Sequence, residues 1–536
     1  MNKKLVMLSS VVLSASTLLA ACSGGGSKTE GQVLNLSTTA DIPSMNPSLA
    51  TDMVSFQTFE NVYEGLYRLD KNTKPVPALA VGEPEKSKDK KTWTIKLRKD
   101  AKWSNGDPVT ANDFVYAWRE VVNPKTGSEY AFIMFDIENA QDINEGKKDV
   151  NSLGVKAIDD HTLQIKLKNV QPYFEGLLSF GTFMPKNEKV AKKYGDKYGT
   201  DAKKAVYNGP FKMTEWKTED SFKLVKNDKY WNKKVVKLEG INYRVVKDVQ
   251  TGLNLYDTDK IDSVGISSDN VEKYKDKPDF KTELTAAMSY FKVNHKNKYL
   301  ANKNVRLAIA KSIDKQSYVD KNLKNGSVPA NQITPKDVYK GPDDTDFSKI
   351  AGGDILKYDT NAAKEYWKKA KQELGEDKIT IELLTTDQET AKTDAEFFKE
   401  QLEKNLDGLT VKIKMQPFKQ KLALEDKRDY DLSYSNWFPD YADPMTFLDL
   451  FWSKQTNTNY KDAKYDQLIE DAKGPLLKDP KARWKALGEA STMLLEEAHT
   501  IPVIQRGSAY LQKTYVKDVL TNSSNIYQYD KAYIKK

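Results

Sequence analysis

Residues 92–119 read TWTIKLRKDAKWSNGDPVTANDFVYAWR, and this stretch contains a strand pattern, a turn signal and a helix start. Trp93, Ile95 and Leu97 fall on one side of its first seven residues. This period of two predicts a half-buried strand. Asn-Gly and Asp-Pro pairs follow at residues 105–108, and both pairs favour a turn.

A helix-start signal comes directly after the turn. Thr110 is a preferred N-cap residue, and Asp113 stands three positions later, so the two predict an approximate capping box. We expect Trp93, Trp103 and Trp118 to pack the lobe that this unit builds. The strand, turn and helix therefore have a structural role and do not read a ligand.

Helix and strand patterns alternate further along the chain. Residues 362–374 predict a helix that ends at Gly375, and residues 378–384 predict a strand. A second helix at residues 390–406 and a second strand at residues 409–415 complete a βαβ unit. Such a unit implies two roughly parallel strands and a right-handed crossover. The sequence thus predicts a mixed α/β protein with several lobes.

Composition excludes several classes of protein. The 536 residues give room for two to four domains, and 9 Trp, 28 Tyr and 19 Phe argue against a disordered chain. The net charge is only +8, with Lys interspersed among Asp and Glu, so we expect no nucleic-acid partner. One Cys and three His exclude an internal disulfide and disfavour a zinc site. We expect no metal and no cofactor.

Catalytic motifs are missing from the chain. It has no GxSxG, HExxH or GxxxxGK[ST] sequence, and the three histidines His161, His295 and His499 are far apart. We therefore expect that the protein is not an enzyme. A secreted hydrolase remains as a minor alternative.

The N-terminus predicts where the protein works. Lys3 and Lys4 precede an uncharged apolar run at residues 5–21, which has the layout of a secretory signal and is short for a membrane span. The sequence LAAC at residues 19–22 resembles the lipobox of bacterial lipoproteins. That resemblance implies cleavage after residue 21 and a lipid on Cys22, with acyl chains such as palmitate. The alternative is an ordinary signal peptide beside an incidental cysteine.

A flexible tether follows the lipobox. Residues 22–30 include the run SGGGSKT, which is typical of a linker. We expect a large extracellular body held on the outer face of the cytoplasmic membrane, with no second anchor.

Phrases along most of the chain resemble one family. Residues 92–119 resemble the signature of the family 5 extracellular solute-binding proteins, the oligopeptide-binding group of ABC importers, here of Gram-positive type. Residues 288–319 are similar to the passage between the family's two lobes, and residues 208–211 and 227–231 also match family phrases. The matching phrases extend from about residue 34 to about residue 510.

The resemblance implies a class II periplasmic-binding-protein-like fold with two lobes, a hinge and a third, inserted domain. The chain would cross between lobes near residues 288–293 and 505–510, and ligand would bind between the lobes. The predicted domains are a signal peptide at 1–21, a lipidated tether at 22–30, lobe I at 31–65, 190–288 and 508–536, an inserted small domain at 66–189, and lobe II at 289–507.

The resemblance also implies a ligand site. Residues 430–451 read YDLSYSNWFPDYADPMTFLDLF and are similar to the family segment that holds a peptide N-terminus. The match places on Asp440 the aspartate that pairs with the α-ammonium group. Trp437 would pack over a ligand side chain, and Asn436 and Phe438 would pair with the peptide main chain as with an added strand.

Another interpretation of this loop stays open. Asp440 and Asp443 could merely cap or terminate a loop before Pro444. Taken alone, the residues DYADP favour this role, whereas the family resemblance favours the ligand role.

Further positions match ligand-facing positions of the family more loosely. They are Tyr130, Thr51, Met53 and Gly265. Two departures argue against a strict preference for short peptides. Tyr434 stands where enteric members have an arginine that can meet a peptide C-terminal carboxylate, and Thr51 stands where they have a glutamate. Arg506 or a lysine in the cleft could take over from the missing arginine.

The predicted function is capture of oligopeptides and their delivery to an ABC permease in the membrane by a monomeric, lipid-anchored protein. One alternative is a dedicated receptor for a signalling peptide such as a mating pheromone. Others are binding of dipeptides, nickel complexes or sugars, or a role in adhesion or chaperoning.

Overall fold

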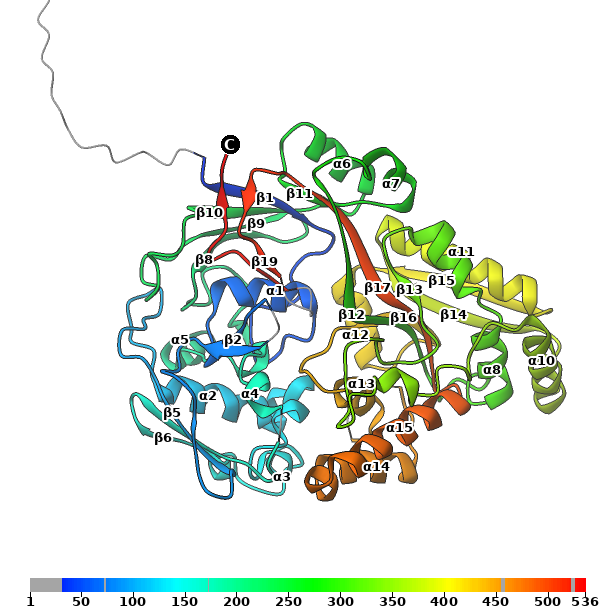
Figure 1. Ribbon diagram of the computed structural model, residues 1–536, viewed down its shortest axis with the longest axis horizontal. Coiled ribbons are helices and arrows are strands. Elements are labelled where there is room, and N and C mark those ends of the chain that lie inside the picture. Colours follow the sequence, from blue (N-terminus) through cyan, green and yellow to red (C-terminus); the bar gives the residue numbers. More distant parts are fainter. Residues whose placement is uncertain (1–30, 72–73, 172, 455–457, 522–525) are drawn as a thin grey trace, which may run out of the picture.

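The computed structural model describes residues 31–71, 74–171, 173–454, 458–521 and 526–536. The predicted signal peptide, Cys22 and the tether lie outside the described residues. Two bodies stand side by side in Figure 1, one formed mainly by the blue-to-cyan part of the chain and one by the green-to-orange part. The mixed α/β class predicted from the sequence is confirmed.

One eleven-stranded sheet passes through both bodies. Its strand order is β15-β14-β16-β12-β17-β11-β1-β10-β9-β8, and β13 adds to β17. The bounds are β15 Leu409–Gln416, β14 Ile379–Thr386, β16 Leu432–Trp437, β12 Phe280–Val293, β17 Thr500–Gln512, β11 Ser263–Gly265, β1 Val33–Thr38, β10 Gly240–Val245, β9 Ser221–Lys226, β8 Phe211–Lys217 and β13 Val328–Pro329.

Two long strands join the bodies. β12 and β17 are antiparallel partners that run next to each other through the middle of Figure 1. Their register shifts between Leu284 and Met288, and again between Ser289 and Tyr290. Two adjacent crossings are the arrangement that lets lobes rotate about a hinge. The predicted lobe and domain boundaries themselves stay a prediction.

The βαβ unit predicted from residues 378–415 is confirmed. β14 and β15 pair in parallel, and α11 (Glu389–Asn405) connects them. The preceding helix α10 (Thr360–Leu374) ends at Gly375, whose φ of 66° is a left-handed conformation that favours glycine.

The stretch around residues 92–119 forms the predicted strand, turn and helix. β5 (Thr92–Lys96) lies in a four-stranded sheet of order β4-β5-β7-β6, and α2 (Ala111–Val122) follows the turn. The capping box is present: the Thr110 N–H donates to the Asp113 carboxylate at 2.8 Å. Asp113 also accepts a bond from the buried Trp103 indole at 3.2 Å. Local sequence therefore sets both the start of the helix and its packing.

The other elements complete the two bodies. Their helices are α1 Met53–Val62, α3 Ala140–Asn144, α4 Phe174–Leu177, α5 Glu188–Tyr194, α6 Val249–Asp257, α7 Ser268–Tyr274, α8 Lys303–Lys311, α9 Lys315–Ser317, α12 Phe418–Asp426, α13 Met445–Leu448, α14 Ala463–Lys473 and α15 Pro480–Glu496. Their strands are β2 Tyr67–Leu69, β3 Pro75–Pro77, β4 Glu85–Lys86, β6 Val155–Asp159, β7 Thr162–Lys166, β18 Val516–Lys517, β19 Leu520–Thr521, β20 Tyr527–Gln528 and β21 Tyr533–Ile534.

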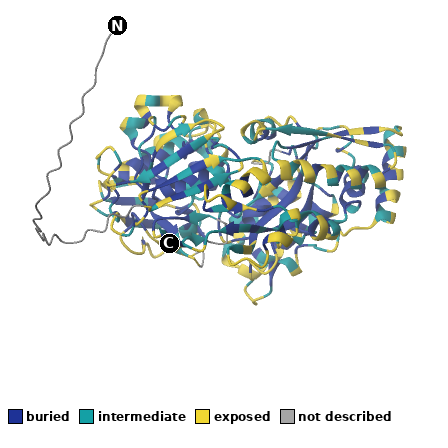
Figure 2. Ribbon diagram, turned by 90° about the horizontal axis from the view of Figure 1, so that it is seen from above, coloured by how far each residue is buried: buried dark blue, intermediate teal, exposed yellow. Residues whose placement is uncertain are grey.

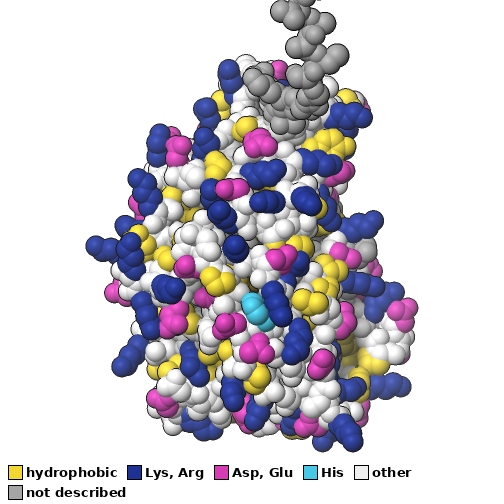
Figure 3. All heavy atoms as spheres, turned by 90° about the vertical axis from the view of Figure 1, so that its left-hand side faces the viewer, with side chains coloured by type: hydrophobic (Ala, Val, Ile, Leu, Met, Phe, Trp, Pro, Cys, Tyr) yellow, Lys and Arg dark blue, Asp and Glu magenta, His cyan; other side chains and the backbone are white. Residues whose placement is uncertain are grey.

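Burial follows the layers of the fold. Strands of the large sheet are buried, and outer helix faces are exposed (Figure 2). On the face drawn in Figure 3, Lys and Arg alternate with Asp and Glu, as the composition suggested. Among the helices of the described ranges, none combines the length and the apolar character needed to cross a bilayer.

Candidate ligand-binding site

A cavity of about 270 Å³ lies between the two bodies. Nine of the ten residues predicted to contact ligand line it, and they come from both bodies: Thr51, Met53, Tyr130, Tyr434, Asn436, Trp437, Phe438, Asp440 and Arg506. The tenth, Gly265, lies in an adjoining cavity of about 390 Å³ that shares Met53 and Phe438 with the first. Segments as far apart in sequence as Thr51 and Arg506 thus converge on one cleft.

The start of α1 forms one wall of this cleft. Asp52 caps the helix by accepting a bond from the Ser55 N–H at 2.9 Å, which fixes the neighbouring Thr51 and Met53. Burial raises the pKa of Asp52 to about 6, although its bonds to Ser55 oppose the shift.

Asp440 is the central polar group of the cavity. Its N–H donates to Thr446 Oγ1 at 3.0 Å, and its Oδ1 accepts from the Tyr130 hydroxyl at 3.4 Å. No cationic side chain of the described residues forms an ion pair with it within 4 Å. Burial, followed by the nearby charge of Asp449, raises the pKa of Asp440 well above its usual range. The cleft therefore holds a carboxyl group whose charge nothing in the described chain compensates.

Asp443, three residues later, is fully paired. Both of its oxygens accept bonds from Arg483, at 2.8 and 2.9 Å, in a bidentate ion pair. Its Oδ1 also accepts from the Met445 N–H at 3.0 Å. The loop-capping interpretation considered for the two aspartates therefore fits Asp443 and does not describe Asp440.

Trp437 covers the cavity next to Asp440. Its ring is parallel to that of Tyr130, with an interplanar angle of 6° and centroids 6.3 Å apart. Its indole N–H lies 3.5 Å from Thr446 Oγ1. The rings of Tyr130 and Trp437 thus line the same cavity as the carboxyl group of Asp440.

Arg506 supplies positive charge in the same cavity. Its guanidinium donates to Asn436 Oδ1 at 3.0 Å and to Ser289 Oγ at 3.2 Å. Within the described ranges it has no carboxylate partner inside 4 Å. Tyr434 lies nearby, and its hydroxyl is 3.3 Å from that of Tyr318. Position 434 carries no arginine in this chain, but Arg506 of β17 brings a cation to the same cavity.

One edge of β16 is open toward the cleft. β12 pairs with β16 along its whole length, but β14 pairs with it only at Leu432 and Ser433. Past Ser433, no strand of the described chain occupies the second edge. An open edge of this kind can accept an extended peptide as an additional strand.

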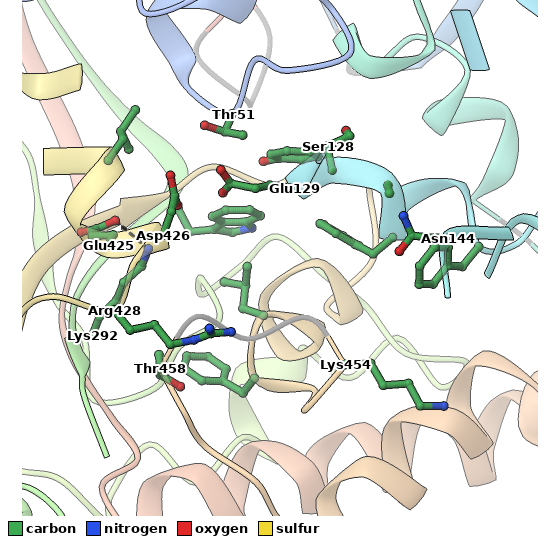
Figure 4. A pocket seen from close by; sticks show the side chains of 18 of the residues that line it. Thr51, Ser128, Glu129, Asn144, Lys292, Glu425, Asp426, Arg428, Lys454 and Thr458 are labelled. Carbon is green, nitrogen blue, oxygen red and sulfur yellow. Dashed lines mark hydrogen bonds and ion pairs between the residues drawn. The ribbon is translucent and has the colours of Figure 1, made fainter. Parts of the chain in front are cut away.

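Sequence reasoning missed a buried ion network in the wall of the cleft. Glu425 pairs with Lys292 at 2.8 Å and with Lys421, and its carboxylate also accepts from Ser433 and Ser435. Burial alone would raise the pKa of Glu425, but the two ammonium groups outweigh burial and hold it well below its usual range. Figure 4 shows Lys292 and Glu425 joined at one side of a neighbouring cavity of about 350 Å³. Lys421 and Glu425 are four residues apart on α12, a spacing that the sequence does show, but Lys292 is distant in sequence and no local motif marks it.

Other polar residues of the cleft were missed for the same reason. Glu129 and Asp426 approach each other from opposite bodies in Figure 4. Burial, together with a hydrogen bond to Asp426, raises the pKa of Glu129 to about 8. In the described parts of the chain, His, Cys, Asp and Glu form no group of three or more that could hold a metal ion.

Comparison with known proteins shows which family has this sequence. Residues 74–459 match the family described as "Bacterial extracellular solute-binding proteins, family 5 Middle". The chain belongs to this family. The resemblance found in the sequence is therefore confirmed.

The family 5 protein described here also resembles individual relatives over nearly its whole length. It is 34% identical to the dipeptide-binding protein DppE of Bacillus subtilis, covering 92% of this chain and 90% of that one. It is 46% identical to the substrate-binding domain of an oligopeptide ABC transporter from Bacillus anthracis, with a TM-score of 0.92 over 95% of this chain and 99% of that one. It is 37% identical to the pheromone receptor PrgZ, with a TM-score of 0.90 over 94% of this chain and 100% of that one.

These likenesses confirm the periplasmic-binding-protein-like fold of this family 5 protein. The family name also places it among proteins that bind solutes outside the cytoplasm. The individual roles of the nine residues gathered in the cleft stay predictions.

Proposed function

We propose that this protein captures oligopeptides in the cleft between its two bodies and delivers them to an ABC permease. The observation that carries the proposal is Asp440: a carboxyl group in the interlobe cavity, bonded to Tyr130 and paired with no cation of the described chain. The match to an oligopeptide ABC transporter domain supports the same cargo.

A peptide α-ammonium is the partner that Asp440 requires. A buried carboxylate is unfavourable without an opposite charge, and an ammonium group supplies both charge and hydrogen-bond donors. Ligand binding would ionise Asp440 and compensate it at once. Trp437 and Tyr130 would exclude water from this contact.

The peptide main chain would extend along the open edge of β16. Asn436 and Phe438 offer N–H and C=O groups there, and such bonds do not depend on ligand side chains. Gly265 of β11 would offer a second edge, because β1 pairs with β11 only through Leu36 and Ser263. This mode of binding accepts many sequences.

The C-terminal carboxylate of a short peptide would meet Arg506. Its guanidinium reaches the cavity and is held by neutral partners, Asn436 and Ser289, so it can still pair with an anion. Tyr434 leaves that position uncharged. This arrangement would serve in place of the arginine of enteric members.

Transport would follow from closure, with no chemistry on the ligand. A peptide that contacts both bodies binds the closed form more tightly, and this difference shifts the equilibrium. The closed protein would dock on the permease as a monomer. We also propose that Cys22 carries the lipid that holds the protein on the outer face of the membrane.

A receptor for a single signalling peptide is the second candidate. It is favoured by the likeness to the pheromone receptor PrgZ. Asp440 would bind the peptide α-ammonium group in the same way, and the two functions would differ only in the pockets that receive peptide side chains.

Native mass spectrometry on residues 23–536 tests the proposal. We expect a spread of bound masses that are released as short peptides, and we expect Asp440→Asn to lose them. Asp354→Asn is a matched control, because that side chain is 89% exposed. One discrete mass would favour the signal receptor. A protein that ignores added peptide mixtures would contradict both candidates.

A further inference from the structure

A charged contact joins the two bodies outside the ligand cavity. Lys247 lies just after β10, in the body that contains β1, and Asp387 lies just after β14, in the body that contains β15. The Lys247 ammonium group is 2.9 Å from Asp387 Oδ2. A hydrogen bond to Asp387, together with one to Glu219, raises the pKa of Lys247 above its usual value, although burial opposes the shift. Lys247 is therefore cationic at neutral pH.

A second bond crosses the same boundary. The Val249 N–H, at the start of α6, donates to Glu389 Oε2 at 3.0 Å. Asp248 caps the same helix by accepting from the Thr251 N–H at 2.6 Å. The first turn of a helix favours a negative charge, so this position suits the Glu389 carboxylate. Figure 1 shows α6 and α11 on the two sides of the boundary between the bodies.

The contact is close to the cavity around Asp440 and separate from it. Its four residues are absent from the described wall of that cavity and from those of the two cavities beside it: Lys247, Val249, Asp387 and Glu389. Their neighbours Gln388 and Thr390 do line the cavity. One short segment therefore faces the ligand site with some residues and the opposite body with others.

The ion pair is accessible to water. The side chains of Lys247 and Asp387 are 33% and 30% exposed. Ion pairs of this kind contribute little to stability and are screened by salt. The Asp387 N–H donates to the Gln416 C=O at 3.0 Å, which holds Asp387 to its own body. A weak contact between two firmly held partners can break and form again whenever the bodies separate.

We propose that Lys247, Asp387 and Glu389 form a latch that holds the two bodies together and sets how long any peptide stays bound, whatever its sequence. This inference rests on the proposed peptide-binding function. Opening about β12 and β17 separates the bodies and must break both bonds. The latch therefore stabilises the closed form alone. Because it does not contact the ligand, its contribution is the same for every peptide.

Glu219 offers a matched control. Its Oε2 is also 2.9 Å from the Lys247 ammonium group, but Glu219 lies between β8 and β9, in the same body as Lys247. That pair does not depend on closure, because β9 and β10 are sheet partners. Asp387→Asn and Glu219→Gln thus each remove one ion pair of the same lysine, and only the first pair crosses the boundary.

The rate of peptide release tests the latch. Two dye-labelled five-residue peptides of unrelated sequence are bound and then displaced by excess unlabelled peptide, and fluorescence anisotropy follows their release. We expect Asp387→Asn to raise the dissociation rate of both peptides by the same factor, about twofold to tenfold. Glu389→Gln should act in the same direction. Glu219→Gln should leave the rate at the wild-type value.

Salt gives a second readout on the same variants. At 1 M ionic strength the Debye length is only about 3 Å, so release from the wild type should be faster than at low salt. Release from Asp387→Asn should respond less, because the ion pair is already missing. An unchanged dissociation rate for Asp387→Asn, or factors that differ between the two peptides, would overturn the latch.

Small-angle X-ray scattering without peptide separates this inference from the proposed function. Open bodies lie farther apart, so we expect a larger radius of gyration for Asp387→Asn than for the wild type and Glu219→Gln. A wild type that binds neither peptide would overturn the proposed function. In that case the scattering comparison still decides the latch, and equal radii for all three proteins would overturn it.

Discussion

Asp440 and Asp443 occupy the same loop and have opposite surroundings. Asp443 is 8% exposed and receives two bonds from Arg483. Asp440 lines the cleft, and its carboxyl receives a single long bond from the described residues, from Tyr130. The protein itself supplies the counter-charge of Asp443. The counter-charge of Asp440 would have to come from a ligand. Residue type alone would not separate a structural aspartate from a binding aspartate, but the hydrogen-bond and ion-pair partners of the two side chains do.

The largest effect is expected on stability, at the ion pair between Arg483 and Asp443. Arg483→Met leaves Asp443 buried without a counter-charge, so the free energy of unfolding should fall by about 3–5 kcal/mol. Urea denaturation followed by circular dichroism measures the change. Lys485→Met on the exposed face of α15 is the control and should leave stability within about 0.5 kcal/mol of wild type. A loss below 1 kcal/mol for Arg483→Met would show that the pair is not essential to the loop.

The next effect is expected at Asp440, and on affinity. Asp440→Asn removes the counter-charge of the α-ammonium group, so peptide affinity should fall about 30-fold to 1000-fold, or about 2–4 kcal/mol. The free energy of unfolding at pH 7 should stay the same or rise, because a partly buried carboxyl without a counter-charge is replaced by a neutral amide. Titration calorimetry and urea denaturation measure the two quantities. Unchanged affinity would remove Asp440 from the ligand site.

The pH dependence of affinity sharpens the comparison. Because the pKa of Asp440 is raised, the carboxyl is protonated at acidic pH and must lose its proton to bind an ammonium group. Affinity should therefore rise with pH up to that pKa, by at most about tenfold per pH unit. It should fall again above about pH 8, where peptide amines lose their charge.

Asp440→Asn is the control for this profile. It should remove the rise on the acidic side and keep the fall on the alkaline side. An unchanged acidic side would assign the proton to another group, such as Glu129.

The smallest effect is expected from Tyr130→Phe. The hydroxyl makes one 3.4 Å bond to Asp440, so its loss should weaken binding about twofold to tenfold. Because this bond favours ionised Asp440, its removal should also move the acidic side of the pH profile to higher pH. Tyr116→Phe, on the helix α2, should change neither property. A larger loss of peptide affinity than for Asp440→Asn would show that Tyr130 contacts the ligand directly.

Local chemistry explains why so much of the fold could be predicted. The capping box of Thr110 and Asp113, the turn before it and the left-handed Gly375 are each set by neighbours in sequence, and each is present as expected. The parallel pairing of β14 and β15 follows from the order of helix and strand. These features need no long-range information.

The site could be predicted only in part. Family phrases led to Asp440 and Trp437, but without that resemblance nothing in the sequence separates Asp440 from Asp443, since the decisive partner Arg483 lies 40 residues away. The contacts of Glu425 with Lys292, Ser433 and Ser435 have the same origin: they form only when β12, α12 and β16 meet, whereas Lys421 pairs with Glu425 within α12. Contacts between distant elements are what periodicity and short motifs do not encode.

The position of Trp437 gives the protein a built-in optical signal. Its indole lies in the cavity wall next to a titratable carboxyl group and parallel to a tyrosine ring. Indole emission responds to nearby charge and to water, so occupancy of the cleft should alter its colour and intensity. Eight other tryptophans add a constant background. The Trp437 ring, which lies in the same cavity wall as Asp440, would thus allow peptide binding to be followed in real time by fluorescence, without an added dye.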